Sequence, residues 1–344
     1  MATTLGFKPK QVVKKLLLAL PERSRDIITK RYGLGDNPEQ MTLDAIGKNY
    51  GITRERVRQI ENHALNVIRK SKNYSEEKAV FDELEKIISS LGGMVVEQDL
   101  LDYLTKDRSF QSQLNFILVV GLPFKKIKED EDFKHRWFID DELANKVHVS
   151  LKRLYENLKD NDLVSEPEMI KTFLGYVDDV AEQYKNEEIC KRWLCVSKKI
   201  SKNPLGEWGK AESSNINTKG MRDYAYLVIR KHGSPIHFRE VAKAITNVFN
   251  KKAHVATTHN ELIKDPRFVL VGRGLYALSE WGYMNGVVKD VIKKLIEKNG
   301  PMTKQEVVDK VMKERYVKEN TIIINLQNKK YFKKNKDGKY EIIK

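Results

Sequence analysis

The apolar residues of the first seventy positions recur at helical spacing, and turn residues interrupt them at regular intervals. One apolar face precedes Pro21, and a second precedes Gly33. Pro and Gly at these points are typical of helix ends. The two faces consist of Leu16, Leu17 and Leu20, and of Ile27, Ile28 and Tyr32. The pattern predicts two short amphipathic helices.

The next two expected helices meet at a glycine turn. Thr42 is a plausible N-cap for a helix over 43–50, Gly51 a left-handed stop, and Thr53 the cap of a helix that begins at Arg54. Gly47 would let the two helices approach closely. The expected shared core is Ile46, Tyr50, Ile52, Val57 and Ile60. This order predicts a helix-turn-helix.

The second of these helices has a polar outward face. Its members are Arg54, Glu55, Arg56, Arg58 and Gln59. Arg can form two hydrogen bonds with guanine and Gln two with adenine, and Glu can accept one from cytosine. The face therefore favours base reading in duplex DNA. The alternative is a solvated face in which charged side chains pair along the helix.

These segments resemble region four of the bacterial primary sigma factors. The matching strings are LPERSRDII (20–28), RYGL (31–34), TLDAIG (42–47) and GITRERVRQIE (51–61). The resemblance covers about 60 residues and implies a domain that reads the promoter minus-35 element. It implies base contacts from Arg54, Glu55 and Gln59 and mainly phosphate contacts from Arg56 and Arg58. We include Thr42 and Thr53 among the DNA-binding candidates.

The same resemblance implies docking on the flap of the RNA polymerase β subunit. The candidate docking residues are Leu16, Leu17, Leu20, Ile27 and Ile28. The alternative is that they form the core of the small helical domain. We find no counterpart of the aromatic-rich segment with which sigma factors open the minus-10 element. We therefore expect that this chain alone does not melt a promoter.

The rest of the chain contains an internal repeat, which is clearest towards the C-terminus. Residues 221–284 and 285–344 each predict three helices followed by two short strands, with Gly272-Arg-Gly and Lys336-Asp-Gly as the turns. Three helices and a hairpin make a winged helix. In the last unit the third helix is mostly apolar.

The same template applies to the middle of the chain. Residues 74–142 predict one winged-helix-like unit and residues 143–209 another, in which we expect separate segments over 187–191 and 193–200. Residues 210–220, rich in Ser, Asn and Gly, predict a linker. With residues 1–73 as the sigma-like domain, the expected fold is mainly α, a helix-turn-helix bundle followed by tandem winged-helix units.

Residues 221–283 also resemble the HARE-type helix-turn-helix. The strings HFREVA (237–242), HNELIKDPRF (259–268) and GRGLYAL (272–278) carry the resemblance, which implies binding to DNA or to the transcription machinery. We expect a second, weaker DNA contact here and on the C-terminal wing. Its candidates are Thr257, Thr258, His259, Lys264, Arg273, Lys333 and Lys334. The alternative is an ordinary solvated surface.

Charge separates the ends from the middle. The formal net charge of the chain is +15, and it divides into +8 for residues 1–73, −6 for 74–220, +5 for 221–284 and +8 for 285–344. Lys and Arg gain affinity for nucleic acid by releasing phosphate-bound counterions. The distribution favours two separate contacts with a polyanion, although basic surfaces also aid solubility.

Other chemistries lack their sequence signals. The pairs His232/His237 and His254/His259 are five apart, which does not align two metal ligands on a helix, and no phosphate-binding loop or nucleophile motif occurs. We expect no metal, no cofactor and no enzymatic activity. Cys190 and Cys195 are expected to be reduced core residues. No apolar run suggests a membrane span or a signal peptide, so we place the chain in the cytoplasm, at the nucleoid.

The leading hypothesis is a bacterial-type transcription factor that reads double-stranded DNA with the helix 54–61 and acts with RNA polymerase. One alternative is a delta-like accessory subunit that binds the polymerase rather than a DNA site. Another is a nonspecific architectural DNA-binding protein. The sequence leaves the target site, the sign of regulation, the oligomeric state and any effector open.

Overall fold

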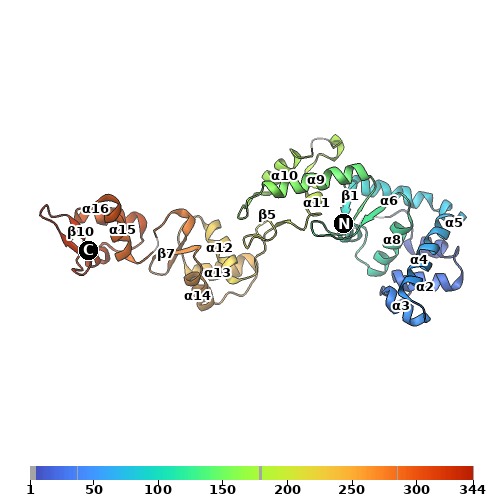
Figure 1. The fold of residues 1–344 in the computed structure, drawn as a ribbon, viewed down its shortest axis with the longest axis horizontal. Coiled ribbons are helices and arrows are strands. Elements are labelled where there is room, and N and C mark those ends of the chain that lie inside the picture. The colour runs from blue at the N-terminus through green and yellow to red at the C-terminus, as the bar shows by residue number, and fades with distance from the viewer. Residues whose placement is uncertain (1–4, 37, 178–179, 285, 344) are drawn as a thin grey trace. The chain divides into compact units, whose positions relative to one another are not determined.

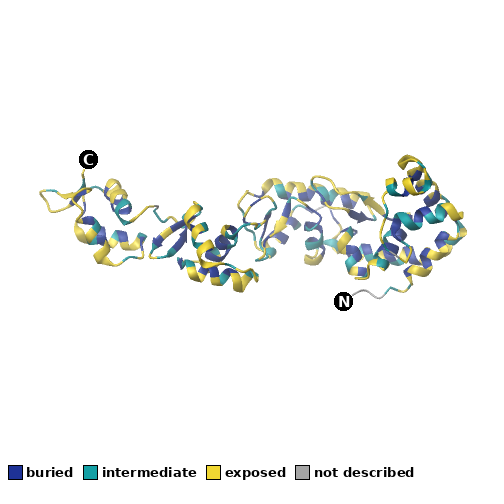
Figure 2. Cartoon of the chain, turned by 90° about the horizontal axis from the view of Figure 1, so that it is seen from below, coloured by how far each residue is buried: buried dark blue, intermediate teal, exposed yellow. Residues whose placement is uncertain are grey.

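The computed structural model describes residues 5–36, 38–177, 180–284 and 286–343. It is mainly helical with small antiparallel sheets, as the sequence predicts (Figure 1). The chain divides into two compact units, one of residues 1–201 with 208–212 and one of 202–207 with 213–344. Along most helices a buried stripe alternates with an exposed one, the pattern of helices that cover a core (Figure 2).

The first unit begins with the sigma-like segment. Its helices are α1 (Pro9–Leu17), α2 (Glu22–Tyr32), α3 (Leu43–Tyr50), α4 (Arg54–Arg69) and α5 (Lys72–Glu76). Helix α2 ends at Gly33, which has a left-handed φ of 62°, and α3 ends at Gly51 with φ 63°. The two glycines that the sequence predicts as helix ends, Gly33 and Gly51, therefore end these helices as expected.

The first repeat follows directly. Its elements are α6 (Lys78–Ser90), β1 (Met94–Val96), α7 (Glu97–Leu104), α8 (Arg108–Val120), β2 (Lys125–Ile127) and β3 (Arg136–Phe138). The sheet order is β1-β3-β2, so the strand between the first two helices pairs with the last strand of the hairpin. Phe138 of β3 lies opposite Met94 of β1 on one side and opposite Lys125 of β2 on the other.

Helix α8 packs against the sigma-like segment. It contacts α1, α2 and α4, and one continuous hydrophobic core runs from Val12 to Trp137. The rings of Tyr32 and Phe116 meet edge to face at 5.2 Å between centroids. The Arg69 guanidinium donates hydrogen bonds to the carbonyls of Val119 (2.8 Å) and Val120 (3.0 Å) at the end of α8. The predicted units 1–73 and 74–142 thus share one core.

The second repeat has the same order of elements. These are α9 (Asp141–Asn157), α10 (Glu166–Leu174), a short 3-10 turn η1 (Glu182–Tyr184), α11 (Glu187–Leu194), β4 (Ile200–Lys202) and β5 (Trp208–Lys210). Val164 forms an isolated antiparallel bridge with Trp208 of β5. It occupies the place that β1 has in the first repeat, before the second helix. Trp193 belongs to α11, so the separate segments expected over 187–191 and 193–200 are one helix that ends at Leu194.

The segment 210–220 is less open than its composition suggests. Ser213, Asn215 and Ile216 are buried within the second unit. The side chain of Asn203 donates to the Asn215 carbonyl, and Arg267 donates to the Asn215 side chain. The boundary between the two units falls between residues 212 and 213, inside this segment, and these hydrogen bonds anchor its later residues to the second unit.

The second unit holds the two C-terminal repeats. The third repeat consists of α12 (Met221–His232), β6 (Ile236–His237), α13 (Phe238–Phe249), α14 (Val255–Lys264), β7 (Phe268–Gly272) and β8 (Leu275–Leu278), followed by a 3-10 turn η2 (Ser279–Trp281). The fourth consists of α15 (Val288–Asn299), α16 (Lys304–Glu314), α17 (Glu319–Leu326), β9 (Phe332–Lys334) and β10 (Tyr340–Ile342).

All four repeats share one strand connectivity. In the third the sheet order is β6-β8-β7, and in the fourth Met302 bridges Tyr340 of the last strand. Each repeat therefore pairs the segment before its second helix with its final strand. This shared topology is that of the winged helix and confirms the fold class read from the sequence.

Among the described residues no helix is both long and apolar enough to cross a bilayer. Within the same residues no three His, Cys, Asp or Glu side chains converge as a metal site would require.

Candidate nucleic-acid interface

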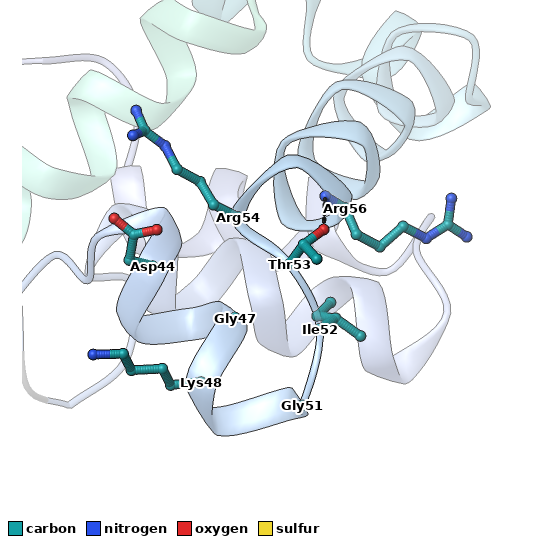
Figure 3. A pocket seen from close by; sticks show the side chains of 8 residues that line it. All are labelled: Asp44, Gly47, Lys48, Gly51, Ile52, Thr53, Arg54 and Arg56. Carbon is teal, nitrogen blue, oxygen red and sulfur yellow. Dashed lines mark hydrogen bonds between the residues drawn. The ribbon is translucent and has the colours of Figure 1, made fainter.

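The turn between α3 and α4 is built by two threonine caps and two glycines. The Thr42 hydroxyl accepts a hydrogen bond from the Ala45 amide (3.1 Å), and the Thr53 hydroxyl accepts one from the Arg56 amide (3.2 Å; Figure 3). Both threonines thus satisfy free amides at helix starts. A Cβ on Gly47 would lie 2.6 Å from the Ile52 carbonyl oxygen, so only glycine permits this close crossing.

The core beneath the turn is the expected one. Ile46 and Val57 are fully buried together with Ile27, and Tyr50, Ile52 and Ile60 pack against them half-buried. A separate polar contact fixes α4 from behind. The Tyr32 hydroxyl donates a 2.8 Å hydrogen bond to the buried Glu61 carboxylate. The orientation of α4 is therefore fixed from two sides.

The five polar residues at the start of α4 are all exposed, as the sequence predicts. Arg58 donates two hydrogen bonds to Glu55 (2.8 and 2.6 Å), and Arg56 donates one to Gln59 (3.1 Å). The bonds from Arg58 hold the pKa of the Glu55 carboxyl below its usual range. This pairing along the helix is the one that a solvated face predicts, and an exposed ion pair such as Arg58–Glu55 contributes little to stability.

Two surface hollows flank the N-terminus of α4. The first, about 720 Å³, lies between α3 and α4, and the second, about 570 Å³, lies between α2 and α4. In Figure 3 the side chains of Arg54 and Arg56 leave the helix on opposite sides. Arg54 lines the first hollow, whereas Arg56 borders both. Cationic side chains therefore surround the start of the helix.

The hollows contain residues that the sequence did not single out. Asp44 and Lys48 of α3 line the first, and Arg23, Ser24 and His63 line the second. His63 lies one turn beyond Gln59 on α4, so the helical spacing could have found it. Arg23 and Ser24 belong to α2, and only the packing of α2 beside α4 brings them to this surface.

The five residues considered for docking on the polymerase flap lie in the interior. The relative exposure of Leu16, Leu17, Leu20, Ile27 and Ile28 is between 0% and 8%. Four of them belong to the core that α8 covers, and Ile27 belongs to the core under the α3–α4 turn. In this conformation they offer no surface to a partner, so the docking interpretation is corrected in favour of the core alternative given beside it.

The candidate second contact is mostly, but not wholly, on the surface. Thr257, Lys264, Arg273, Lys333 and Lys334 are exposed. Thr258 is completely buried, and this corrects its place among the DNA-binding candidates. It lies on the inner face of α14, whereas its neighbour Thr257 lies on the outer face.

His259 has a packing role in the third repeat. Its ring stacks on Phe238 at 4.1 Å between centroids, and Tyr276 meets its edge at 5.8 Å. The ring is half-buried. Only part of this side chain remains for a ligand.

Comparison with known proteins identifies one family, which matches the N-terminal part of the chain. The sigma-70 region 4 family matches residues 16–70. The principal sigma factor HrdD of Streptomyces viridifaciens is 42% identical over 76 residues, which are 20% of this chain and 23% of that protein. The sigma factor RpoS of Coxiella burnetii is 47% identical over 57 residues, 17% of this chain and 16% of that protein.

A third relative is the sigma factor RpoD of Helicobacter pylori, 43% identical over 60 residues, 17% of this chain and 9% of that protein. The chain thus spans less than a quarter of the length of each of these relatives. The matched stretch ends at Lys70, the C-cap of α4. It contains the helix-turn-helix and the residues that line both hollows. Residues 16–70 are a sigma-70 region 4 domain.

Proposed function

We propose that this chain is a DNA-binding transcription factor that reads duplex DNA with α4 and acts with RNA polymerase. The observation that carries the proposal is the exposed set Arg54, Glu55, Arg58 and Gln59 at the start of a rigidly held helix in a sigma-70 region 4 domain. These side chains have the hydrogen-bonding groups that distinguish base edges in the major groove.

The surroundings of α4 suit a phosphate backbone on both sides of the groove. Lys48 and Arg54 border one hollow, and Arg23 and Arg56 border the other. Contacts of this kind set the register of a protein on DNA, while the base contacts select the sequence. We assign Arg56 and Arg23 mainly to phosphates and Glu55 and Gln59 mainly to bases.

The second unit would add a contact without strong sequence choice. Its C-terminal wing carries the exposed lysines 329, 330, 333, 334, 336 and 339. In contrast, the outer face of α17 presents Ile324, which is 69% exposed and cannot hydrogen bond to a base. We propose that this repeat approaches the DNA backbone with its wing, and that Arg273 and Lys264 of the third repeat contribute similarly.

Association with RNA polymerase would have to use surfaces other than the buried apolar residues of α1 and α2. Because α8 of the same chain already covers Leu16, Leu17, Leu20 and Ile28, a partner could reach them only by displacing α8. This favours a primary role for DNA reading over a role as an accessory subunit docked through these residues.

The test is a selection from randomised duplex DNA with the full chain at fixed moderate salt. The selection is repeated with Arg54, Glu55 and Gln59 all changed to alanine. We expect a defined motif with the natural chain and its loss with the triple variant. Selection of the same motif by both would refute base reading by α4, and no motif in either would favour an architectural binder or a polymerase subunit.

A further inference from the structure

An apolar groove lies at the start of α1, away from the helix-turn-helix. It has a volume of about 600 Å³, within the range of ligand-binding pockets. One wall is the segment from Leu5 to Gln11, and the other is formed by the end of α7 and the first turns of α8. None of its lining residues belongs to the candidate DNA surface.

The floor and walls of the groove are hydrophobic. Leu104 and Leu114 form buried parts of the lining, with 3% and 0% relative exposure. Leu5 and Phe7 are half-buried, and Phe110 is 44% exposed although it is a large aromatic residue. Apolar side chains that remain accessible in a concave site are typical of positions where a partner inserts an anchor residue.

The charged side chains among the described lining residues are Lys8 and Lys10, and both are exposed. The carboxylate of Glu83 on α6 lies beside the first wall, where it accepts a 2.8 Å hydrogen bond from the Gly6 amide. Helix α1 also starts here, and no side chain of the described residues caps its N-terminus. The partial positive charge of a helix start adds to that of the two lysines. The groove is thus complementary to carboxylates.

The acidic side chains of the neighbouring α7–α8 turn are already engaged. Asp107 caps α8 by accepting a hydrogen bond from the Phe110 amide (2.9 Å). Asp102 accepts hydrogen bonds from Gln98 (3.0 Å) and Gln111 (2.9 Å) and pairs with Lys106. Among the described residues neither aspartate pairs with Lys8 or Lys10.

We propose that this groove binds a short acidic segment of a partner protein that inserts bulky apolar side chains beside Phe110. The apolar floor supplies the affinity, and Lys8 and Lys10 select acidic flanks over basic ones. A nucleic acid would satisfy the lysines but would leave the apolar floor exposed to water. The proposal concerns a protein contact and does not depend on the DNA-reading role of α4.

The experiment is a selection of randomised twelve-residue peptides displayed on phage against the full chain. It is repeated against Phe110→Asp, Phe110→Ser and the double variant Lys8→Glu/Lys10→Glu. Leu18→Asp is the matched control, because Leu18 is 59% exposed and lies at the other end of α1. Circular dichroism and thermal unfolding verify that each variant keeps its fold.

We expect enriched peptides that combine Asp or Glu with Leu, Phe or Trp. Synthetic copies should bind the natural chain and the Leu18 variant alike, and the Phe110 and lysine variants at least ten-fold more weakly. Enrichment of basic or uncharged peptides, or no enrichment, would overturn the proposal. So would binding that survives Phe110→Asp. If Phe110→Ser instead weakened binding of a duplex oligonucleotide, the groove would belong to the nucleic-acid surface.

Discussion

Tyr32 on α2 and Glu61 on α4 form a hydrogen bond of 2.8 Å inside the sigma-70 region 4 domain. Arg31 adds an ion pair to the same carboxylate at 3.4 Å between Nε and Oε1. Burial raises the pKa of Tyr32 well above its ordinary value, and the charge of Glu61 adds to this effect. The pair joins the helix that carries the base-facing residues to the helix behind it.

Replacing Tyr32 with Phe should destabilise the first unit by about 1–3 kcal/mol, because the buried Glu61 carboxylate loses a donor. Thermal unfolding measures the loss. Tyr103→Phe is the control, because Tyr103 is exposed on the surface of α7, and it should leave the midpoint unchanged. Equal midpoints for Tyr32→Phe and the natural chain would contradict the structural role of the pair.

The two glycines of the α3–α4 region should respond differently to alanine. Gly47→Ala should cost roughly 1–3 kcal/mol, because its Cβ would meet the Ile52 carbonyl at 2.6 Å and push the turn away. Gly51→Ala should cost only about 1 kcal/mol, since its surroundings are open within 4 Å and only its φ of 63° is unfavourable. DNA affinity should fall more for Gly47→Ala than for Gly51→Ala. A larger fall for Gly51→Ala would show that the chain does not pass close to α3 at Gly47.

The contact between Arg69 and α8 predicts a local loss of protection. In Arg69→Ala the Val119 and Val120 carbonyls lose charge-assisted hydrogen bonds, each worth about 1.5–3 kcal/mol before relaxation. Hydrogen exchange of the last turn of α8 should accelerate, while α3 stays unchanged. Lys72→Ala, an exposed site nearby in the sequence, is the control. Unchanged exchange in Arg69→Ala would show that packing alone holds α8.

His148 on α9 should make the first unit sensitive to acid. Burial, followed by the positive charge of Arg136, lowers the pKa of His148 to about 4. Arg136 Nε donates to His148 Nε2 at 2.7 Å, which requires the neutral ring, and Asp130 and Lys152 are the other charged neighbours. The folded-state pKa is below the unfolded value near 6.5, so the unfolded chain binds the extra proton between these pH values.

Stability is therefore complete above about pH 6.5 and falls as the pH approaches 4, by at most about 3 kcal/mol. Urea unfolding between pH 7 and 4 measures this slope. His148→Gln keeps an acceptor for Arg136 but does not titrate, and it should flatten the slope. If the natural chain and the variant lose stability in parallel, other groups account for the acid sensitivity.

The C-terminal wing should contribute salt-dependent affinity without sequence preference. Lys333 and Lys334 are exposed on β9, and Lys333 pairs only with the partly exposed Glu341 at 3.2 Å among the contacts of the described residues. Changing both to Ala should weaken all duplexes alike and reduce the slope of log affinity against log salt by about 2. A change confined to one sequence would assign base contacts to the wing.

Much of the helix-turn-helix could be predicted because its signals are local. Thr42 and Thr53 cap helices through contacts three residues away, and Gly51 ends α3 by its own backbone conformation. The outward face of α4 follows from helical spacing and the burial of Val57. The repeated order of helices and hairpins was readable for the same reason where turns carry glycine, as at Gly233, at Gly300 and in the hairpin turns 272–274 and 336–338.

Other parts of the candidate site depend on contacts distant in the sequence. Arg23 reaches the surface beside Gln59 only because α2 packs against α4. Thr258 and Thr257 have similar chemistry, yet the packing of α14 buries the first and exposes the second. A polar sequence cannot distinguish such neighbours, because the rotation of a short helix is set by its partners.

Capping, backbone conformation and periodicity are local properties, so the sequence was sufficient to place most helix ends, the outward face of α4 and the repeated winged-helix order, with the end of α11 as an exception. What covers the apolar faces of α1 and α2 depends on contacts between segments far apart in the sequence. Those faces would suit a partner protein or a core equally well, since hydrophobic attraction has no direction and selects no partner. Helix α8, about a hundred residues from α1, covers them and joins the sigma-70 region 4 domain to the first repeat.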